Sequence, residues 1–211
     1  MTADRRTVAL AGHTGDVAAA EQGLAHPDPA VRATALGALD RLGVLADERL
    51  AAFFADVDPR VRRRAVGLSA RRREMDLAVP LADHDPAVVE TAAWACGEHE
   101  TVPDDVFDML VALARGSAAG KDALVREAAV AALGAIADDR GLDVILAATS
   151  DRPAIRRRAV LGLAPFVDPD HPRAADVAAA LARATSDRDW QVRQAAEDIS
   201  AASTDPEEDR F

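Results

Sequence analysis

The sequence predicts an all-α protein, a right-handed α-solenoid (superhelix) of about six stacked helix pairs, and two observations predict it. The first is composition: apolar residues make up 49% of the 211 residues, yet aromatic residues make up only 3% and tyrosine is absent. Small side chains let helices approach closely and alanine is the strongest helix former, whereas a β-sandwich uses more aromatic and β-branched residues. The second observation is a short phrase that recurs along the whole chain.

The phrase reads Asp-Pro-x-Val-Arg-x-x-Ala, with local departures. It occurs six times, and its anchoring apolar residues lie 27 to 37 residues apart. Self-similarity at this period is typical of repeat proteins in which each unit is one supersecondary motif. The anchors are Val31, Val61, Val88, Val125, Ile155 and Val192.

Each part of the phrase has a physical role in starting and burying a helix. Aspartate caps free backbone amides, and proline at the first turn needs no hydrogen-bond donor. The anchor, an alanine four residues on and often a leucine eight residues on form one buried stripe at helical spacing. A second apolar helix precedes the copies, for example over residues 48–57, 106–115, 142–149 and 177–185. The predicted unit is therefore helix A, a short turn and helix B.

The ends of the chain differ from its repeats. Residues 5–11 predict a helix that caps the stack, and residues 203–211 predict an acidic, disordered tail. Two longer connections, over residues 116–120 and 168–172, are too short to separate domains. We therefore expect one domain over residues 1–202.

The recurring phrase resembles the HEAT-repeat superfamily, in particular its bacterial short-repeat form with the Asp-Pro-x-Val-Arg-x-x-Ala signature. The resemblance covers roughly residues 15–202 and implies fold far more than function. It also implies that the arginine after the anchor is a structural ladder residue tied to a neighbouring repeat. Val89 replaces this arginine in the third copy. The arginines to which the role is carried over are Arg32, Arg62, Arg126, Arg156 and Arg193.

Charge and cysteine usage limit the classes of partner. Acidic residues number 36 against 25 basic ones, so the formal charge is −11, which repels nucleic acid and anionic membranes at long range. Cys96 is the only cysteine, which excludes an intramolecular disulfide and a cysteine-based zinc cluster. Neither a signal-like apolar segment nor a long apolar run is present. We expect a cytoplasmic monomer without a membrane partner.

Motifs for catalysis are nearly absent. The sequence has no phosphate-binding glycine loop, no nucleophile elbow and no His-Glu-x-x-His motif. His99-Glu100 is similar to the metal-binding His-Glu pairs of deoxyhypusine hydroxylase, a HEAT-repeat enzyme, but that family uses several such pairs and this chain has one. We therefore predict no metal, no cofactor and no enzyme activity.

The candidate binding surface lies on the B helices, which line the concave side of solenoids of this type. Positions two, three and six residues after each anchor are expected to face that groove. Trp94 stands at such a sixth position near the middle of the array, and an exposed tryptophan is a frequent binding hot spot. The alternative is that Trp94 fills space left by small neighbours and belongs to the core.

Charged residues surround Trp94 in this pattern. Arg63 with Glu90, and Glu127 with Arg157, are expected to form salt bridges between repeats, or else to leave a mixed-charge groove suited to a protein or peptide segment. Glu98 lies one turn beyond Trp94. The predicted partner-binding residues are Arg63, Arg64, Glu90, Trp94, Glu98, Glu127, Arg157, Arg158 and Leu161.

The predicted function is a non-catalytic interaction or scaffold module for a protein or peptide partner. One alternative is a nucleic-acid-binding protein similar to HEAT-fold DNA glycosylases for alkylated bases, which use a basic concave face, paired tryptophans and a carboxylate; Trp94, Trp190 and Glu98 fit that pattern superficially. The net charge and the acidic Glu90 and Glu127 oppose it, because binding the DNA backbone depends on unopposed cations. A second alternative is a structural subunit of an obligate complex.

Overall fold

The computed structural model describes residues 4–117 and 122–204, and these residues form helices and turns without a β-strand. The chain divides into two compact units, residues 1–101 and residues 102–211, which are described separately here. A single domain over residues 1–202 stays a prediction. No helix of the described residues is long and apolar enough to cross a membrane.

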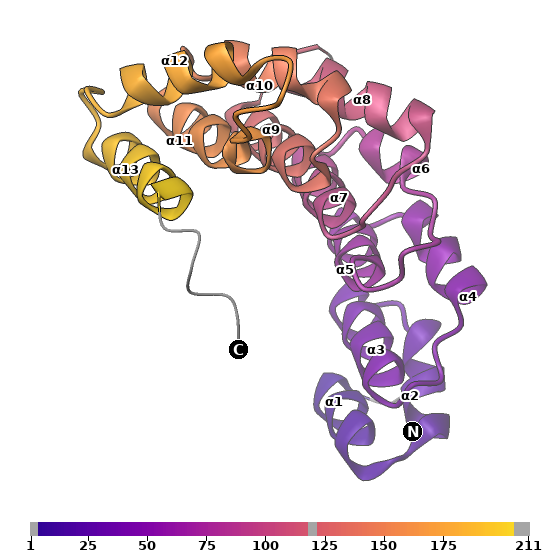
Figure 1. Ribbon diagram of the computed structural model, residues 1–211. Helices are drawn as coiled ribbons and strands as arrows, with labels where there is room; N and C mark the ends of the chain where they lie inside the picture. Colours follow the sequence, from indigo (N-terminus) through magenta and orange to yellow (C-terminus); the bar gives the residue numbers. More distant parts are fainter. Residues whose placement is uncertain (1–3, 118–121, 205–211) are drawn as a thin grey trace. The chain divides into compact units, whose positions relative to one another are not determined.

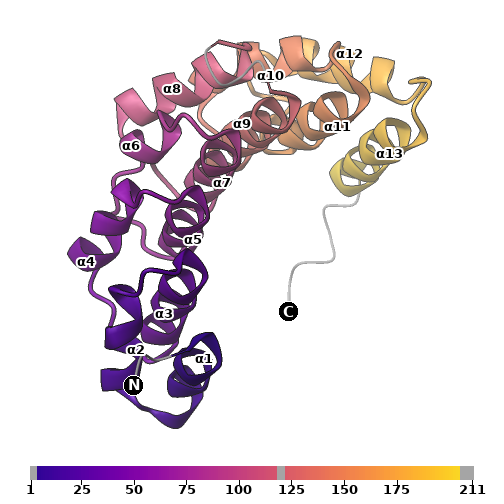
Figure 2. The same cartoon turned by 180° about the vertical axis from the view of Figure 1, so that it is seen from behind.

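The first unit contains α1 and three A–B helix pairs. Helices α1, α3, α5 and α7 pack side by side in one row, and α2, α4 and α6 lie along the other side of that row (Figures 1 and 2). The elements are α1 (Arg5–Thr14), α2 (Val17–Leu24), α3 (Pro29–Arg41), α4 (Asp47–Ala52), η1 (Phe53–Ala55), α5 (Pro59–Ser69), α6 (Ala78–Leu81) and α7 (Pro86–Gly97).

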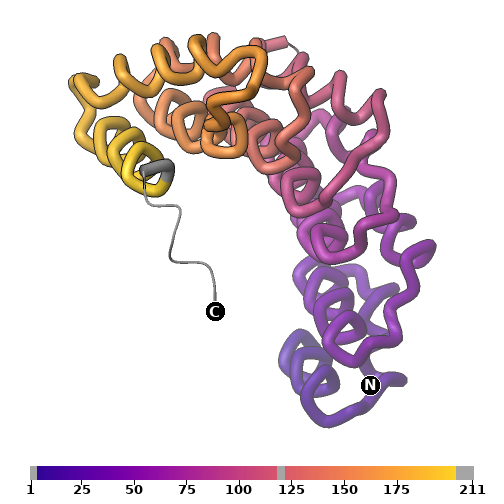
Figure 3. The backbone as a smooth tube through the Cα atoms, viewed as in Figure 1, coloured from indigo at the N-terminus to yellow at the C-terminus, as the bar shows by residue number. Residues whose placement is uncertain are grey.

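The second unit contains three further pairs in the same alternation. Helices α9, α11 and α13 are its B helices, and the backbone trace of Figure 3 shows α11 and α13 each following an A helix after a short turn. The elements are α8 (Asp104–Ala114), α9 (Ala123–Ile136), η3 (Asp139–Gly141), α10 (Leu142–Ala148), α11 (Pro153–Gly162), η4 (Ala164–Phe166), α12 (Ala174–Ala184) and α13 (Trp190–Thr204).

Every copy of the recurring phrase starts a B helix, so the six predicted pairs are confirmed. Four B helices begin at the proline of the phrase. The capping aspartate accepts a hydrogen bond from the amide two residues on, for instance Asp28 from Ala30 at 2.8 Å and Asp85 from Ala87 at 2.9 Å. Arg152, which replaces this aspartate, makes no side-chain cap. The all-α class is confirmed; the right-handed sense of the superhelix stays a prediction.

The buried stripe of each B helix also follows the phrase. The anchors are at most 2% exposed, and the alanine four residues after each anchor is fully buried. Because these alanines carry only a methyl group, neighbouring helices approach closely there. The alanines are Ala35, Ala65, Ala92, Ala129, Ala159 and Ala196.

The two ends of the stack differ in how far the structure describes them. The capping helix predicted for residues 5–11 exists as α1, which continues to Thr14 and packs on α3. Helix α13 runs through Thr204, two residues into the segment predicted as an acidic tail. The rest of that segment lies outside the described residues.

Candidate functional site

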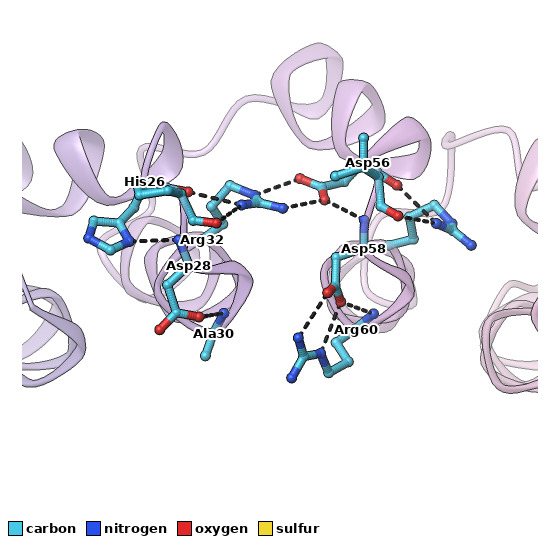
Figure 4. A network of polar contacts seen from close by, with 10 residues as sticks. His26, Asp28, Ala30, Arg32, Asp56, Asp58 and Arg60 are labelled. Carbon is cyan, nitrogen blue, oxygen red and sulfur yellow. Dashed lines mark hydrogen bonds and ion pairs between the residues drawn. The ribbon is translucent and has the colours of Figure 1, made fainter.

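The first feature of the B helices is a ladder of buried arginine–aspartate pairs. In the first turn of α3, Arg32 donates from Nε and Nη2 to the carboxylate of Asp56 at 2.8 and 2.7 Å (Figure 4). Its Nη1 also donates to the carbonyls of His26 and Pro27 at 2.9 and 3.0 Å. One guanidinium therefore ties the turn of its own repeat to the turn of the next.

The same bond pattern recurs one repeat later. Arg62 donates to both carboxylate oxygens of Asp83 at 2.6 and 2.8 Å and to the carbonyl of Asp56 at 2.9 Å. The side chains of this pair are only 6% and 7% exposed. Bidentate, charge-assisted hydrogen bonds are the strongest that arginine forms, so the ladder is a firm link between repeats.

The ladder aspartates also support their own turns. Asp56 accepts from the Asp58 amide at 2.9 Å, and Asp83 accepts from the Asp85 amide at 2.8 Å. In the first turn, which no earlier phrase arginine precedes, His26 takes this place and its Nδ1 accepts from the Asp28 amide at 3.0 Å. The first turn therefore has the same backbone hydrogen bond as the later turns, but the side chain that accepts it is not acidic.

The second unit repeats the ladder with one weaker member. Arg156 donates to both oxygens of Asp187 at 2.9 and 2.7 Å. Arg126 pairs with Asp151 through Nη2 alone, and its buried Nε has no hydrogen-bond partner among the described residues. Arg193 bonds the carbonyl of Asp187 in its own turn at 2.8 Å. The inter-repeat role is therefore confirmed for Arg32, Arg62, Arg126 and Arg156, and Arg193 keeps only the bond to its own turn.

The ladder aspartates have lowered pKa values. Burial raises the pKa of Asp83, but the hydrogen bonds from Arg62 and from the Asp85 amide outweigh burial and leave the pKa below its ordinary value. Burial is likewise opposed and outweighed at Asp56. At Asp187 the hydrogen bond from Arg156 is the largest cause of a lowered pKa. Shifted pKa values here mark structural ion pairs.

The second feature is an open pocket on the B helices of the first unit, called here the Trp94 pocket. Trp94 is 48% exposed, so the interpretation as a core residue is wrong. The pocket has a volume of about 630 Å³ and lies along α5 and α7. It is lined by Arg60, Arg63, Arg64, Gly67, Glu90, Thr91 and Trp94.

Charges in the Trp94 pocket are held by bonds between α5 and α7. The Nη2 of Arg63 lies 3.6 Å from a carboxylate oxygen of Glu90, and its Nε donates to Oγ1 of Thr91 at 3.0 Å. The predicted Arg63–Glu90 salt bridge is therefore present. Glu98 follows Trp94 as an exposed residue at the end of α7 and does not line the pocket.

Arg64 lies on the other side of α5 and covers Gly37 of α3. A Cβ at Gly37 would overlap the guanidinium of Arg64. Arg64 is exposed, and within the described residues it has neither an ion pair nor a hydrogen bond. It is a free cation positioned by a glycine.

The second unit carries the remaining predicted residues on α9 and α11. Glu127 accepts from Nε of Arg158 at 3.0 Å, so the prediction that Glu127 pairs with Arg157 is wrong. Arg158 stands one position further round α11 and reaches back to α9, whereas Arg157 has no ion pair in the described part of the chain. Leu161 is 37% exposed on the next turn of α11.

A cluster of cations that the sequence analysis missed lies between α1 and α3. An open cleft of about 370 Å³ there is lined by Arg5, His13, Arg41 and Arg64 together with small residues. Arg5 and His13 are eight residues apart and therefore share one face of α1. That spacing was the available signal, but α1 lies outside the repeating phrase on which the search for groove residues was based.

Groups with other chemistry are buried or dispersed. Burial raises the pKa of the Cys96 thiol to about 12, so it is not a nucleophile at neutral pH. His99 is 4% exposed and its Nε2 lies 3.2 Å from the carbonyl of Ser69. Within residues 4–117 and 122–204, no three His, Cys, Asp or Glu side chains gather as metal ligands.

Comparisons with known proteins agree with the repeat pattern. A family model described as HEAT repeats matches residues 76–164. This segment consists of HEAT repeats. The match includes about the last quarter of the first unit and somewhat more than half of the second, and it confirms the resemblance that the recurring phrase carries.

Two solved structures share the fold of this chain. A designed armadillo repeat protein, YIII(Dq)4CqI, is 18% identical with a TM-score of 0.60, over 87% of this chain and 98% of that one. An engineered protein, a Northeast Structural Genomics Consortium target, is 17% identical with a TM-score of 0.60, over 90% and 96%. At these identities the likeness shows the fold alone. No curated protein matches the chain.

Proposed function

We propose that this HEAT-repeat protein is a non-catalytic interaction module that binds a protein or peptide segment on its B helices, with Trp94 as the anchor. The observation that carries the proposal is the half-exposed Trp94 in an open pocket of the first unit. Tryptophan is the residue type most enriched among binding hot spots, because it removes a large apolar surface from water on binding. A partner that covers this half-exposed indole therefore lowers the free energy of the complex, because apolar surface leaves water.

The surroundings of Trp94 favour an extended peptide over a small molecule. The pocket is open, and its walls carry Arg63 and Glu90 paired across neighbouring helices. A fixed cation and a fixed anion beside an aromatic surface suit the mixed polar and apolar groups of a peptide. The surface is preorganised, since Arg63 is also held by Thr91, which lowers the entropy lost when a partner binds.

The second unit carries the remaining predicted residues on a surface of its own. Arg157, Arg158 and Leu161 stand on α11, and Glu127 on α9. Arg158 is held by Glu127 as Arg63 is held by Glu90. We assign these residues a supporting role in binding, with Glu98 as a rim residue of the first unit.

The titrating groups support a role without catalysis. The aspartates whose pKa values are shifted are shifted downward by arginine or backbone hydrogen bonds, as at Asp56, Asp83 and Asp187. A general acid needs the opposite shift, toward the working pH. The strongest electrostatic arrangements in this chain therefore serve its structure.

Selection of a random peptide library displayed on phage tests the proposal. The immobilised full chain is expected to enrich related sequences, and the same selection on Trp94→Ala is expected to enrich none of them. Trp190→Ala is the matched control, because Trp190 is the other tryptophan and is 64% exposed in the second unit. Circular dichroism establishes that each variant keeps its helix content.

Binding of the selected peptides is then measured by fluorescence anisotropy. We expect Trp94→Ala to weaken binding by at least about 2 kcal/mol, the usual limit for a hot spot, and Trp190→Ala to leave it unchanged. Equal enrichment on wild type and Trp94→Ala would contradict the proposal. Enrichment of a DNA duplex over all peptides in a competition assay would favour the nucleic-acid alternative instead.

A further inference from the structure

The cleft between α1 and α3 is the most one-sided electrostatic feature of the first unit. Its charged lining consists of Arg5, Arg41 and Arg64, joined by His13, and no aspartate or glutamate lines it. This composition is unusual for a chain in which acidic residues outnumber basic ones by 36 to 25. We call it the cationic cleft.

The side chains of the cationic cleft lie free of intramolecular partners. Within the described residues, none of Arg5, His13, Arg41 and Arg64 takes part in an ion pair or side-chain hydrogen bond. Asp40, the chain neighbour of Arg41, is bound by Arg72 at 2.7 Å. The acid next to Arg41 is thus paired elsewhere, and Asp4, the acid next to Arg5, caps α1 by accepting from the Thr7 amide at 2.7 Å and does not line the cleft.

Two glycines leave room for two of the guanidiniums, and one of these glycines, Gly37, lines the cleft. A Cβ at Gly12 would lie 3.0 Å from Nη1 of Arg41, and a Cβ at Gly37 would overlap the guanidinium of Arg64. Both arginines therefore lie against bare backbone. Their donors are held near one another, while Ala9, Ala30 and Ala33 keep the rest of the lining small.

We propose that the cationic cleft binds the carboxylate side chains of an acidic peptide segment of the partner. Guanidinium groups match carboxylates in charge and in hydrogen-bond geometry, and free guanidiniums that converge on one cleft are the usual arrangement for reading acidic motifs. The charge of the cleft excludes basic segments. Its small alanine lining leaves room for side chains of the length of glutamate.

Arg64 joins the cationic cleft to the Trp94 pocket, because it lines both. One extended segment therefore places acidic residues over α1 and α3 and an apolar residue against Trp94. This part of the inference rests on the proposed function and specifies the chemistry of its partner. A polyphosphate backbone fits less well, since Glu90 stands in the adjoining pocket and repels it.

Anisotropy of fluorescein-labelled hexaglutamate with the full chain tests the cleft by itself. We expect saturable binding that weakens as salt rises, since the contacts are exposed, and none with labelled hexaglutamine. Arg41→Gln and Arg64→Gln are each expected to weaken binding by about threefold to tenfold. Arg183→Gln is the matched control: it removes the same charge from an exposed position on α12 and should change nothing.

Gly37→Ala separates a positioned guanidinium from net charge. The added methyl group displaces Arg64 and leaves the charge of the chain unchanged, so hexaglutamate binding is expected to fall about as far as with Arg64→Gln. Equal loss with Arg183→Gln, or no change with Gly37→Ala and Arg41→Gln, would overturn the proposal. So would a single-stranded oligonucleotide of equal charge that displaces hexaglutamate at lower concentration.

The outcome is separable from that of the proposed function. Trp94→Ala should leave hexaglutamate binding intact while it abolishes selection of library peptides. If library peptides bind through Trp94 but carry no acidic residues and are insensitive to Arg41→Gln, the cleft assignment fails and the interaction module stands. If hexaglutamate binds as expected and Trp94→Ala has no effect on library peptides, the proposed function fails and the cleft assignment stands.

Discussion

Two runs of three arginines lie in B helices, one in each unit, and show how neighbouring helices determine the contacts of identical residues. In α5 the run is Arg62 to Arg64, and in α11 it is Arg156 to Arg158. The first arginine of each run is a buried ladder residue, 6% and 7% exposed. The other two differ: α5 pairs its second arginine with an acid, whereas α11 pairs its third.

The difference follows from the residue two positions after the anchor of the adjacent B helix. The second arginine of a run reaches forward to that position in the next repeat, and the third reaches back to it in the previous one. After α5 the position holds Glu90 and before it Ala33; after α11 it holds Gln194 and before it Glu127. Each run therefore has one arginine with a carboxylate within reach and one without, and the free ones are Arg64 and Arg157.

The largest effect on stability is expected at the buried first arginine of a run. Arg62→Ala leaves the carboxylate of Asp83 buried and unpaired, so we expect a loss of about 3–5 kcal/mol in the free energy of unfolding. Arg63→Ala, one residue on, removes only a half-exposed pair and should cost less than about 1 kcal/mol. Urea denaturation followed by circular dichroism compares the two, and equal midpoints would refute the distinction between ladder and surface.

Acid is expected to weaken the ladder. The pKa values of Asp56, Asp83 and Asp187 are lowered in the folded protein, so their stabilisation is complete above the unfolded carboxyl pKa of about 3.9 and is lost as the pH falls through the lower folded values. The urea midpoint should thus fall steeply below about pH 4. In Arg62→Met/Asp83→Leu, which removes a pair together, that fall should be shallower; an unchanged slope would contradict the assignment.

Glycine substitutions sharpen the comparison between the units. In the second unit a Cβ at Gly134 would lie 2.5 Å from the Cα of Gly162, so Gly134→Ala forces two helix backbones apart and should cost about 1–3 kcal/mol. In the first unit Gly37→Ala meets only the flexible end of Arg64. We expect it to gain up to about 1 kcal/mol, because alanine in a helix is favoured over glycine. Thermal or urea unfolding of both variants measures the opposite signs.

The smallest effect is expected when a free arginine is given an acid. Ala33→Glu places a carboxylate at the position to which Arg64 reaches back, and should add about 0.2–1 kcal/mol of stability. The same variant should also weaken hexaglutamate binding at least as far as Arg64→Gln does, because the carboxylate occupies Arg64 and lowers the charge of the cationic cleft by one. Gln194→Glu is the counterpart for Arg157 and should stabilise without touching the cleft. If Ala33→Glu binds hexaglutamate as tightly as the wild type does, Arg64 does not bind the carboxylates of the peptide.

The sequence predicted those parts of the molecule that repeat. The anchors, the buried alanines and the capping aspartates recur at fixed spacing, so the helix pairs and the ladder arginines were visible before the structure. The partner of the ladder was not, although Asp56, Asp83 and Asp187 each lie five residues before an anchor, because these aspartates stand ahead of the phrase and pair with the arginine of the preceding copy. The exposure of Trp94 depends on the small size of Gly67 and Thr91 beside it, which a pattern of positions does not measure.

The remaining differences arise where side-chain reach or an unrepeated element decides the contact. Arg157 and Arg158 are equally spaced candidates for Glu127, and only the direction in which each leaves α11 selects Arg158. The cationic cleft needs α1, which has no phrase, and two glycines whose role appears only when the arginines lying over them are known. Contacts of this kind depend on how neighbouring helices pack, and the repeat pattern describes each helix separately.

The arginine–aspartate ladder gives the middle repeat of each unit two connections, an arginine that binds the following turn (Arg62, Arg156) and a turn aspartate that receives the preceding arginine (Asp56, Asp151). The first helix pair has no carboxylate that could receive an arginine. His26 stands at that position and keeps the hydrogen bond of the turn, but it carries no negative charge. A duplicate of such a middle repeat placed beside the original would find both ladder partners, whereas a repeat added before α2 would find no carboxylate for its arginine. The ladder therefore permits duplication of a repeat within each unit and disfavours the addition of a repeat before the first one.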